Sequence, residues 1–359
     1  MTPLAELLLR RIALEGPIDL ADYMAECLLH PEHGYYATRD PLGAAGDFVT
    51  APEISQIFGE LIGAALASWW DAAGRPEAPM LVELGPGRGT LAADALRVMR
   101  RVVPGLTVHL VEASPVLRDV QRKAVPEAVH HDRLEDVPEG PMLLVGNEFV
   151  DALPIRAFQR EGDGWRTRVV GEREGVLALG LAPPARLAAL EHRIADTRDG
   201  DIVEMRPAAG ALMAEVERRL LATPGAALLI DYGDWRSLGD TLQAVRGHAP
   251  EDPLAHPGEA DLTAHVDLEA LARAAPRLPH SLLTPQGVFL ERLGATPRAQ
   301  ALAARGDADA VAAAHRRLLH PDEMGTLFKA MAWTSPGTPM LPGLEGASLP
   351  PEARPNTGT

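Results

Sequence analysis

From residue 80 onward, short apolar runs alternate with segments in which apolar residues recur at helical spacing. The predicted strands cover residues 80–84, 107–112, a short element starting at 129, 142–146 and 226–231. Helices are predicted between the first strands, over 90–102 and 115–124. Strands that are separated by helices favour parallel pairing with right-handed crossovers. The pattern therefore predicts an α/β fold with a mostly parallel central sheet.

The rest of the chain shows other patterns, and these divide it into regions. We predict an N-terminal helical lid region over 1–75, with two short helices over 4–30, a Gly- and Pro-rich loop over 31–52 and an apolar helix over 52–73. Residues 76–154 and 226–334 form the predicted core; within it we expect a loop from 231 to about 266, and apolar segments at 281–293 and 326–333 that complete the sheet. Between the two core parts, 155–225 is an insertion with hairpin-like alternation and a helix at 207–222, which we expect to form a substrate or dimer surface. A tail rich in Pro and Gly follows over 335–359.

Composition narrows the class of protein. The 359 residues include 50 acidic and 34 basic side chains, so the net charge of −16 argues against binding to nucleic acid or to an anionic membrane. A single cysteine, Cys27, excludes an internal disulfide and a cysteine-cluster metal site. No apolar run reaches the ~18 residues that a spanning helix needs. Charged residues interrupt the first 20 positions, so we expect a cytoplasmic protein without a secretory signal or membrane insertion.

A glycine-rich loop, Glu-Leu-Gly-Pro-Gly-Arg-Gly-Thr at 83–90, lies between the first predicted strand and the first predicted helix. This context makes a cofactor-binding fingerprint credible. Gly85 allows a tight turn, Gly87 lets a ligand approach the backbone, and Gly89 lets helix and strand pack closely. The alternative interpretation is a helix cap that binds no ligand.

Two cofactor classes use such a loop, and the charges near it distinguish them. A dinucleotide would place its pyrophosphate on the helix N-terminus, where Glu83 would repel it. S-adenosylmethionine carries a sulfonium and an ammonium group, which a carboxylate attracts. Glu112, at the end of the second strand, is placed to accept hydrogen bonds from ribose hydroxyls. Asp132 either accepts the adenine amino group or is a solvated loop carboxylate. We therefore predict S-adenosylmethionine as the cofactor.

A polar motif, Asn-Glu-Phe-Val-Asp at 147–151, ends the fourth strand of the predicted sheet. Ligands of open α/β sheets bind at the carboxyl ends of strands, so the catalytic candidates are Asn147, Glu148 and Asp151. Asn147 could orient a nucleophile, and the two carboxylates would suit a guanidinium and help its proton leave. Alternatively, Asp151 caps a helix and Asn147 holds a turn. The histidines form no zinc-type pair backed by a carboxylate, so no metal site is predicted.

Several segments together resemble the MidA-type family, whose eukaryotic members are mitochondrial complex I assembly factors. They are GDFVTAPEISQIFGE (46–60), LVELGPGRGTL (81–91), HLVEASP (109–115), NEFVDALP (147–154), LLIDYG (228–233) and DLTAHVD (261–267). The resemblance implies a class I, Rossmann-like methyltransferase with N-terminal helices and a family-specific α+β insertion. It also implies that Gly85, Gly87 and Gly89 line the cofactor, with Glu112 on its ribose. By the same resemblance, a lid beside the cofactor contains Gly46, Asp47, Thr50 and Glu53.

The function that this resemblance implies is methylation of arginine on a protein substrate, such as a subunit of respiratory complex I. Asn147-Glu148 stands where animal members are expected to have His-Glu, so another arginine or a different nucleophile stays open as the acceptor. Two alternatives remain: a methyltransferase of small molecules, and an assembly or binding factor without essential catalysis. A homodimer is also left open.

Overall fold

The computed structural model describes residues 1–38 and 49–347. Within these ranges, eight strands form a central sheet in the order β15-β16-β10-β5-β2-β3-β4, with β14 paired to β10. The strands are β2 (Met80–Leu84), β3 (Thr107–Val111), β4 (Val129–His131), β5 (Met142–Asn147), β10 (Gly225–Asp234), β14 (Val266–Asp267), β15 (Thr284–Pro285) and β16 (Phe328–Thr334). The pairs from β4 through β10 are all parallel, and β16 runs antiparallel to β10. The predicted α/β fold with a mostly parallel sheet is confirmed.

Helices cover both faces of this sheet, because its central strands are apolar on both sides. In β2, Leu81 packs into the core beneath α5 (Gln56–Ala72) and α6 (Thr90–Met99). Its neighbour Val82 points the other way, toward α8 (Pro207–Ala222) and α9 (Leu268–Ala274). Successive side chains of a strand alternate between faces, so a fully buried strand reads as a continuous apolar run. The helices α7 (Pro115–Ala124), α10 (Gln286–Arg292), α11 (Ala295–Ala303) and α12 (Ala308–Leu319) complete this lower lobe.

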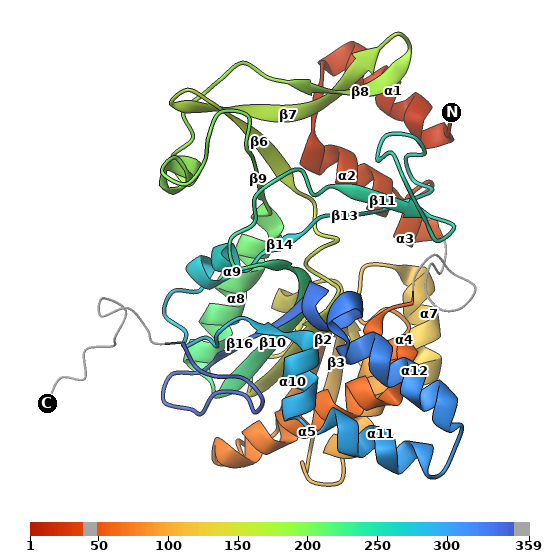
Figure 1. Ribbon diagram of the computed structural model, residues 1–359, viewed down its shortest axis with the longest axis vertical. Coiled ribbons are helices and arrows are strands. Elements are labelled where there is room, and N and C mark those ends of the chain that lie inside the picture. The colour runs from red at the N-terminus through yellow and green to blue at the C-terminus, as the bar shows by residue number, and fades with distance from the viewer. Residues whose placement is uncertain (39–48, 348–359) are drawn as a thin grey trace, which may run out of the picture.

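A second lobe lies over the carboxyl ends of the central strands, at the top of Figure 1. Its larger sheet joins the insertion to the N-terminus through β1 (Ile18–Asp19), β6 (Arg156–Glu161), β7 (Gly164–Arg173), β8 (Val176–Leu181) and β9 (Ile202–Met205). The helices α1 (Pro3–Glu15) and α2 (Leu20–Leu29) share a hydrophobic core with this sheet. A smaller sheet in the order β12-β11-β13 consists of β11 (Gln243–Arg246), β12 (Ala249–Glu251) and β13 (Asp261–Thr263). The upper lobe is thus assembled from three segments that are far apart along the chain.

The structure departs from the sequence predictions in several places. The predicted sheet segment 281–293 is mostly wrong: Thr284–Pro285 is a strand, and α10 follows from Gln286. The stretch 231–266, expected to be a loop, contains β11–β13, whose strands of three or four residues are too short for a clear alternation. The apolar helix at 52–73 is broken at the extended Ser55 into α4 (Ala51–Ile54) and α5. Finally, region 1–75 is not one helical unit, since α1 and α2 belong to the upper lobe and α5 packs on α6.

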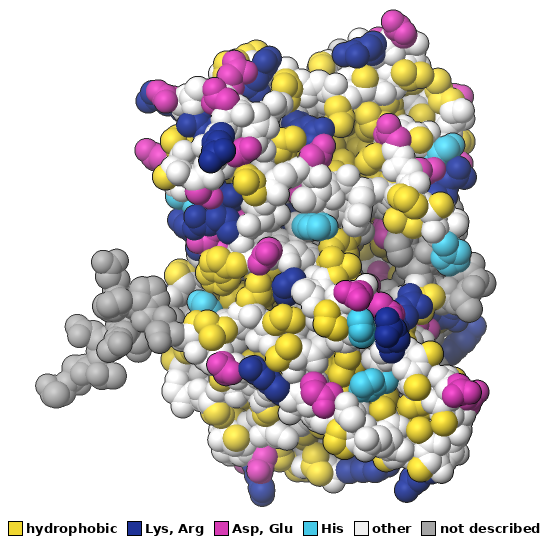
Figure 2. All heavy atoms as spheres, in the orientation of Figure 1, with side chains coloured by type: hydrophobic (Ala, Val, Ile, Leu, Met, Phe, Trp, Pro, Cys, Tyr) yellow, Lys and Arg dark blue, Asp and Glu magenta, His cyan; other side chains and the backbone are white. Residues whose placement is uncertain are grey.

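The charged side chains on the surface and the lengths of the helices match the expectations drawn from the composition. Figure 2 shows acidic and basic side chains interspersed over the face seen in that view. Among the residues that the structure describes, no helix combines the length and the apolar character needed to cross a bilayer.

Candidate functional site

A cavity of about 930 Å³ lies between the two lobes, at the carboxyl ends of β2, β3, β5 and β10. Seven carboxylates stand among its described lining residues, against two arginines and two histidines. The acidic members are Glu53, Glu83, Glu112, Asp132, Glu148, Asp151 and Asp261. Carboxylates that share a low-dielectric space repel one another and are stabilised by a bound cation. The cavity is therefore suited to positively charged ligands.

The glycine loop connects β2 to α6 with three left-handed residues, Gly85, Gly87 and Gly89, whose φ angles are +56°, +54° and +81°. A Cβ atom on Gly85 would lie 2.6 Å from the ring of Phe149. Both this collision and the left-handed backbone therefore exclude a side chain at position 85. A Cβ atom on Gly89 would meet Ala124 at an ordinary 3.5 Å. Backbone conformation, rather than the predicted close packing, therefore explains the glycine at 89.

Glu83, the next-to-last residue of β2, lies in the cavity wall and is only 3% exposed. Its Oε2 atom has no hydrogen-bond partner. The pKa of Glu83 is raised to about 8, mainly by burial; the backbone N–H of Ala92 opposes this rise, and the charge of the nearby Glu112 adds to it. A buried carboxylate that lacks a counter-charge destabilises the free protein. A cation that binds beside it is attracted by this charge and removes the destabilisation.

Glu112 follows β3 and faces the same cavity. Its Oε1 accepts the backbone N–H of Ser114 at 2.8 Å, and its Oε2 accepts from Gln121 Nε2 at 3.2 Å. These two bonds fix the carboxylate while leaving acceptor capacity for further donors. Burial raises the pKa of Glu112.

The other predicted cofactor residues lie at the rim of the cavity or outside the described part of the chain. The Asp132 side chain is 76% exposed and pairs with Arg118. Thr50 lines the cavity and precedes α4, and Glu53 on the same helix accepts a hydrogen bond from Thr90. Gly46 and Asp47 lie outside the described residues.

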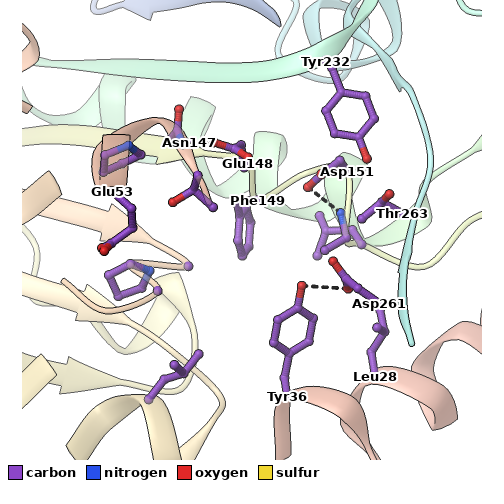
Figure 3. Close-up of a pocket in the computed structure, with 18 of the residues that line it drawn as sticks. Leu28, Tyr36, Glu53, Asn147, Glu148, Phe149, Asp151, Tyr232, Asp261 and Thr263 are labelled. Atoms are coloured by element: carbon purple, nitrogen blue, oxygen red, sulfur yellow. Dashed lines mark hydrogen bonds between the residues drawn. The ribbon is translucent and has the colours of Figure 1, made fainter. Parts of the chain in front are cut away.

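The end of β5 points two polar side chains into the cavity (Figure 3). Asn147 donates through Nδ2 to Glu148 Oε1 at 2.9 Å, and its buried Oδ1 has no partner. Glu148 adopts a left-handed φ of +51°, which is strained for this residue type and is held by a bond from its N–H to the carbonyl of Ile230. Burial raises the pKa of Glu148 to about 7, the charge of Asp151 adds to this, and the N–H of Ala51, 2.9 Å from Oε1, opposes it.

Asp151 lies one turn further on and is 5% exposed. Its Oδ1 accepts the backbone N–H of Ala152 at 2.7 Å, so the carboxylate supports a turn rather than capping a helix. Burial raises the pKa of Asp151 to about 6, although the nearby guanidinium of Arg206 and a hydrogen bond from Tyr232 lower it. The structure thus places Asn147, Glu148 and Asp151 along one wall of the cavity.

Two residues that shape the cavity wall were not predicted as site residues: Asp231, which supports a turn of the wall, and Tyr36, which lines the cavity. Asp231 accepts the N–H groups of Val150 and Asp151 at 2.9 and 3.2 Å, and so holds the 147–151 turn. Its sequence signals were its place at the end of an apolar strand and within the segment 228–233 that carries the family resemblance. Tyr36 donates to Asp261 Oδ1 at 2.8 Å, a pair 225 residues apart that no local pattern could reveal.

The residues present fit S-adenosylmethionine. The cofactor would bring two positive groups, a sulfonium and an ammonium, to a cavity whose Glu83 carboxylate is buried and half-unpaired. The left-handed glycines expose backbone beside it, and Glu112 stands at the neighbouring strand end.

Comparison with curated proteins agrees with this geometry. The chain is 38% identical to the mitochondrial protein arginine methyltransferase NDUFAF7 of Mus musculus, over 92% of this chain and 84% of the relative. The homologous protein of Drosophila melanogaster is 35% identical, over 96% of this chain and 86% of the relative. The expectation of a cytoplasmic protein is corrected by this comparison, because these relatives are named as mitochondrial proteins.

Solved structures and family comparison lead to the same class. A protein from Burkholderia thailandensis bound to S-adenosyl-homocysteine superposes with a TM-score of 0.81 at 32% identity, covering 95% of this chain and 93% of the other. A second crystal structure from the same organism superposes with a TM-score of 0.80 at 31% identity, covering 96% and 95%. Residues 61–282 match the family described as S-adenosyl-L-methionine-dependent methyltransferase. The resemblance noted in the sequence is therefore confirmed, and the chain belongs to this family of S-adenosylmethionine-dependent methyltransferases.

Proposed function

We propose that this enzyme methylates the side chain of arginine in a protein. The observation that carries the proposal is the unpaired Oδ1 of Asn147 beside the strained, cavity-facing Glu148. A guanidinium offers N–H donors in a planar fork and carries the positive charge that such a pair of acceptors would stabilise. The curated relatives that are named protein arginine methyltransferases support the same substrate class.

For the cofactor, we propose that the carboxylate of Glu83 faces the amino-acid moiety and that Glu112 accepts the ribose hydroxyls. The loop of Gly85, Gly87 and Gly89 would lie against the cofactor. Asp132 would reach the adenine from the rim, and Thr50 would lie beside the cofactor. When bound, S-adenosylmethionine supplies a methyl group on a positively charged sulfur.

The chain's own residues would orient the acceptor and remove its proton. Asn147 Oδ1 would accept one N–H of the reacting guanidinium nitrogen and thereby direct its lone pair toward the methyl group. As the new N–C bond forms and the S–C bond breaks, that nitrogen becomes more acidic. Glu148, whose pKa of about 7 suits it for proton transfer near neutral pH, would accept the proton. Asp151 would hold positive charge on the remaining nitrogens.

The charge of the cavity favours a cationic acceptor, such as the guanidinium of arginine, over a small apolar acceptor. Its volume of about 930 Å³ is at the upper end of ligand pockets, and seven acidic side chains lie among its described lining residues. The finer proposal, carried by the family resemblance, is that the acceptor is a subunit of respiratory complex I.

Peptide methylation tests the proposal. We expect transfer of one or two methyl groups to arginine when the protein is incubated with S-adenosylmethionine and a complex I subunit, located by fragmentation mass spectrometry. Glu148→Gln should lower kcat by about 100-fold, as expected for loss of a proton acceptor. Glu6→Gln, an exposed glutamate on α1, is the matched control and should retain full activity. Methylation of another residue type by the wild-type protein would refute the assignment to arginine.

A further inference from the structure

Tyr36, on the short helix α3 (Tyr35–Thr38), joins two walls of the cavity that belong to different lobes. Its hydroxyl donates to Asp261 Oδ1 of β13 at 2.8 Å. Its backbone carbonyl accepts from Ser114 Oγ at 2.6 Å, and the N–H of Ser114 donates to Glu112 Oε1 at 2.8 Å. An unbroken chain of hydrogen bonds thus runs from Glu112, beside the glycine loop, to the upper lobe.

The residues at both ends of this chain are buried and take part in further hydrogen bonds. Ser114 is 3% exposed and also caps α7 through a bond from the N–H of Leu117. Asp261 is 5% exposed and is held in β13, which pairs with β11. Burial, together with the charges of Asp261 and Asp151, raises the pKa of Tyr36 far above its usual range, so its hydroxyl stays protonated and donates. Figure 3 shows Tyr36 directed at Asp261, with Asp151 and Thr263 close by.

Resting on the proposed role of Glu112 toward the cofactor, we propose that Tyr36 is a positioning residue that couples cofactor binding at Glu112 to the part of the cavity wall formed by β13, which we call the acceptor wall. Donors that bind Glu112 fix the carboxylate that also receives the Ser114 N–H. A fixed Ser114 holds the Tyr36 backbone, and a fixed Tyr36 holds Asp261 beside the turn that contains Asp151. A ligand that orders one end of such a network lowers the entropy that the second ligand must lose. The cofactor therefore prepares the acceptor wall before the acceptor arrives.

Hydrogen–deuterium exchange of the full chain tests this coupling without any acceptor, with S-adenosyl-homocysteine as the probe. In the wild type, the probe should slow exchange both in the peptide 83–91, which contains the glycine loop, and in the peptide 259–266, which contains β13. Tyr36→Phe removes only the hydroxyl. It should bind the probe with a Kd within about twofold of the wild type and keep protection at 83–91, yet lose most of the protection at 259–266.

Two further variants keep the test decisive. Ser114→Ala interrupts the chain one step earlier and should lose the same protection at 259–266 even if Tyr36→Phe folds poorly. Tyr23→Phe is the matched control, because it removes another tyrosine hydroxyl of the upper lobe, one that donates to the carbonyl of Pro253. Its exchange pattern should equal that of the wild type. Equal protection of β13 in the wild type and in both chain variants would overturn the proposal, as would a wild type protected at 83–91 but not at 259–266.

A kinetic readout extends the test and rests on the proposed arginine methylation. With an arginine-containing peptide as acceptor, Tyr36→Phe should raise the peptide KM by about tenfold, the size expected for losing a hydrogen bond to a charged group, with kcat within about twofold. If the wild type does not methylate the peptide, the proposed function fails while the exchange result still decides the coupling.

Discussion

Replacing Glu83 by glutamine should make the cofactor-free protein more stable while weakening its affinity for the cofactor. The carboxyl is 3% exposed, and its Oε2 is unpaired. Its pKa of about 8 in the folded protein lies above its ordinary value of 4.5. An acid whose pKa is raised by folding does not affect stability below the unfolded pKa. It destabilises the fold increasingly as the pH rises toward the folded pKa, and the effect is constant above that.

The linkage relation sets the expected size of this effect. At pH 7 the raised pKa corresponds to about 3 kcal/mol of lost stability, and Glu83→Gln removes this penalty because glutamine has no charge to desolvate. At pH 5 the difference from the wild type should be below about 1 kcal/mol. Urea denaturation of both proteins at pH 5, 7 and 8, without cofactor, measures the difference directly.

With the cofactor bound, we expect the wild type to gain more stability than Glu83→Gln. An ammonium or sulfonium beside the carboxylate forms a charge-assisted contact that glutamine replaces only in part, so Glu83→Gln should bind S-adenosylmethionine about 10–100-fold more weakly. Binding to the wild type at pH 7 should also release close to one proton, detected by calorimetry in buffers of different ionisation enthalpy. If the variant is no more stable than the wild type at pH 8, or if the gain is the same at pH 5, the reasoning about Glu83 is refuted.

Two further predictions concern Gly85 in the glycine loop and the cavity-facing Glu148. Gly85→Ala should destabilise the protein by at least about 1 kcal/mol more than Gly105→Ala in thermal denaturation, because both glycines have positive φ but only the Cβ at 85 would collide with Phe149; equal losses would contradict the collision. Methyl transfer should rise with pH through about 7, as Glu148 ionises, and this rise should vanish in Glu148→Gln; a profile unchanged by the substitution would assign the titration to another group.

The elements around the glycine loop could be predicted from the sequence because local signals agree there. β2 and α7 begin and end where predicted, since the first is a short run that is apolar except for Glu83 and the second begins at Pro115 after a capping serine. The acidic residues Glu83 and Glu112 flank parallel strand ends, and parallel pairing alone brings such ends together. The class of cofactor could therefore be predicted from residues 83–112 alone.

The acceptor side could not be predicted in the same way, because long-range contacts build it. Asp231 meets the 150–151 turn across 80 residues, and Tyr36 meets Asp261 across 225. The strands β11–β13 hold three or four paired positions each, too few for a period to emerge. This side of the cavity depends on the whole fold, so local sequence patterns do not predict it.

The upper lobe is assembled from distant segments of the chain, and this affects folding during synthesis on the ribosome. Ile18 pairs with Val170, and Thr2 reaches the carbonyl of Pro257, so the first two helices must wait for most of the chain before they find their partners. Contacts of such sequence separation are slow to form. During translation, the apolar faces of α1 and α2 stay uncovered until residues 155–264 have been made, so we expect a chaperone to bind this segment of the nascent chain.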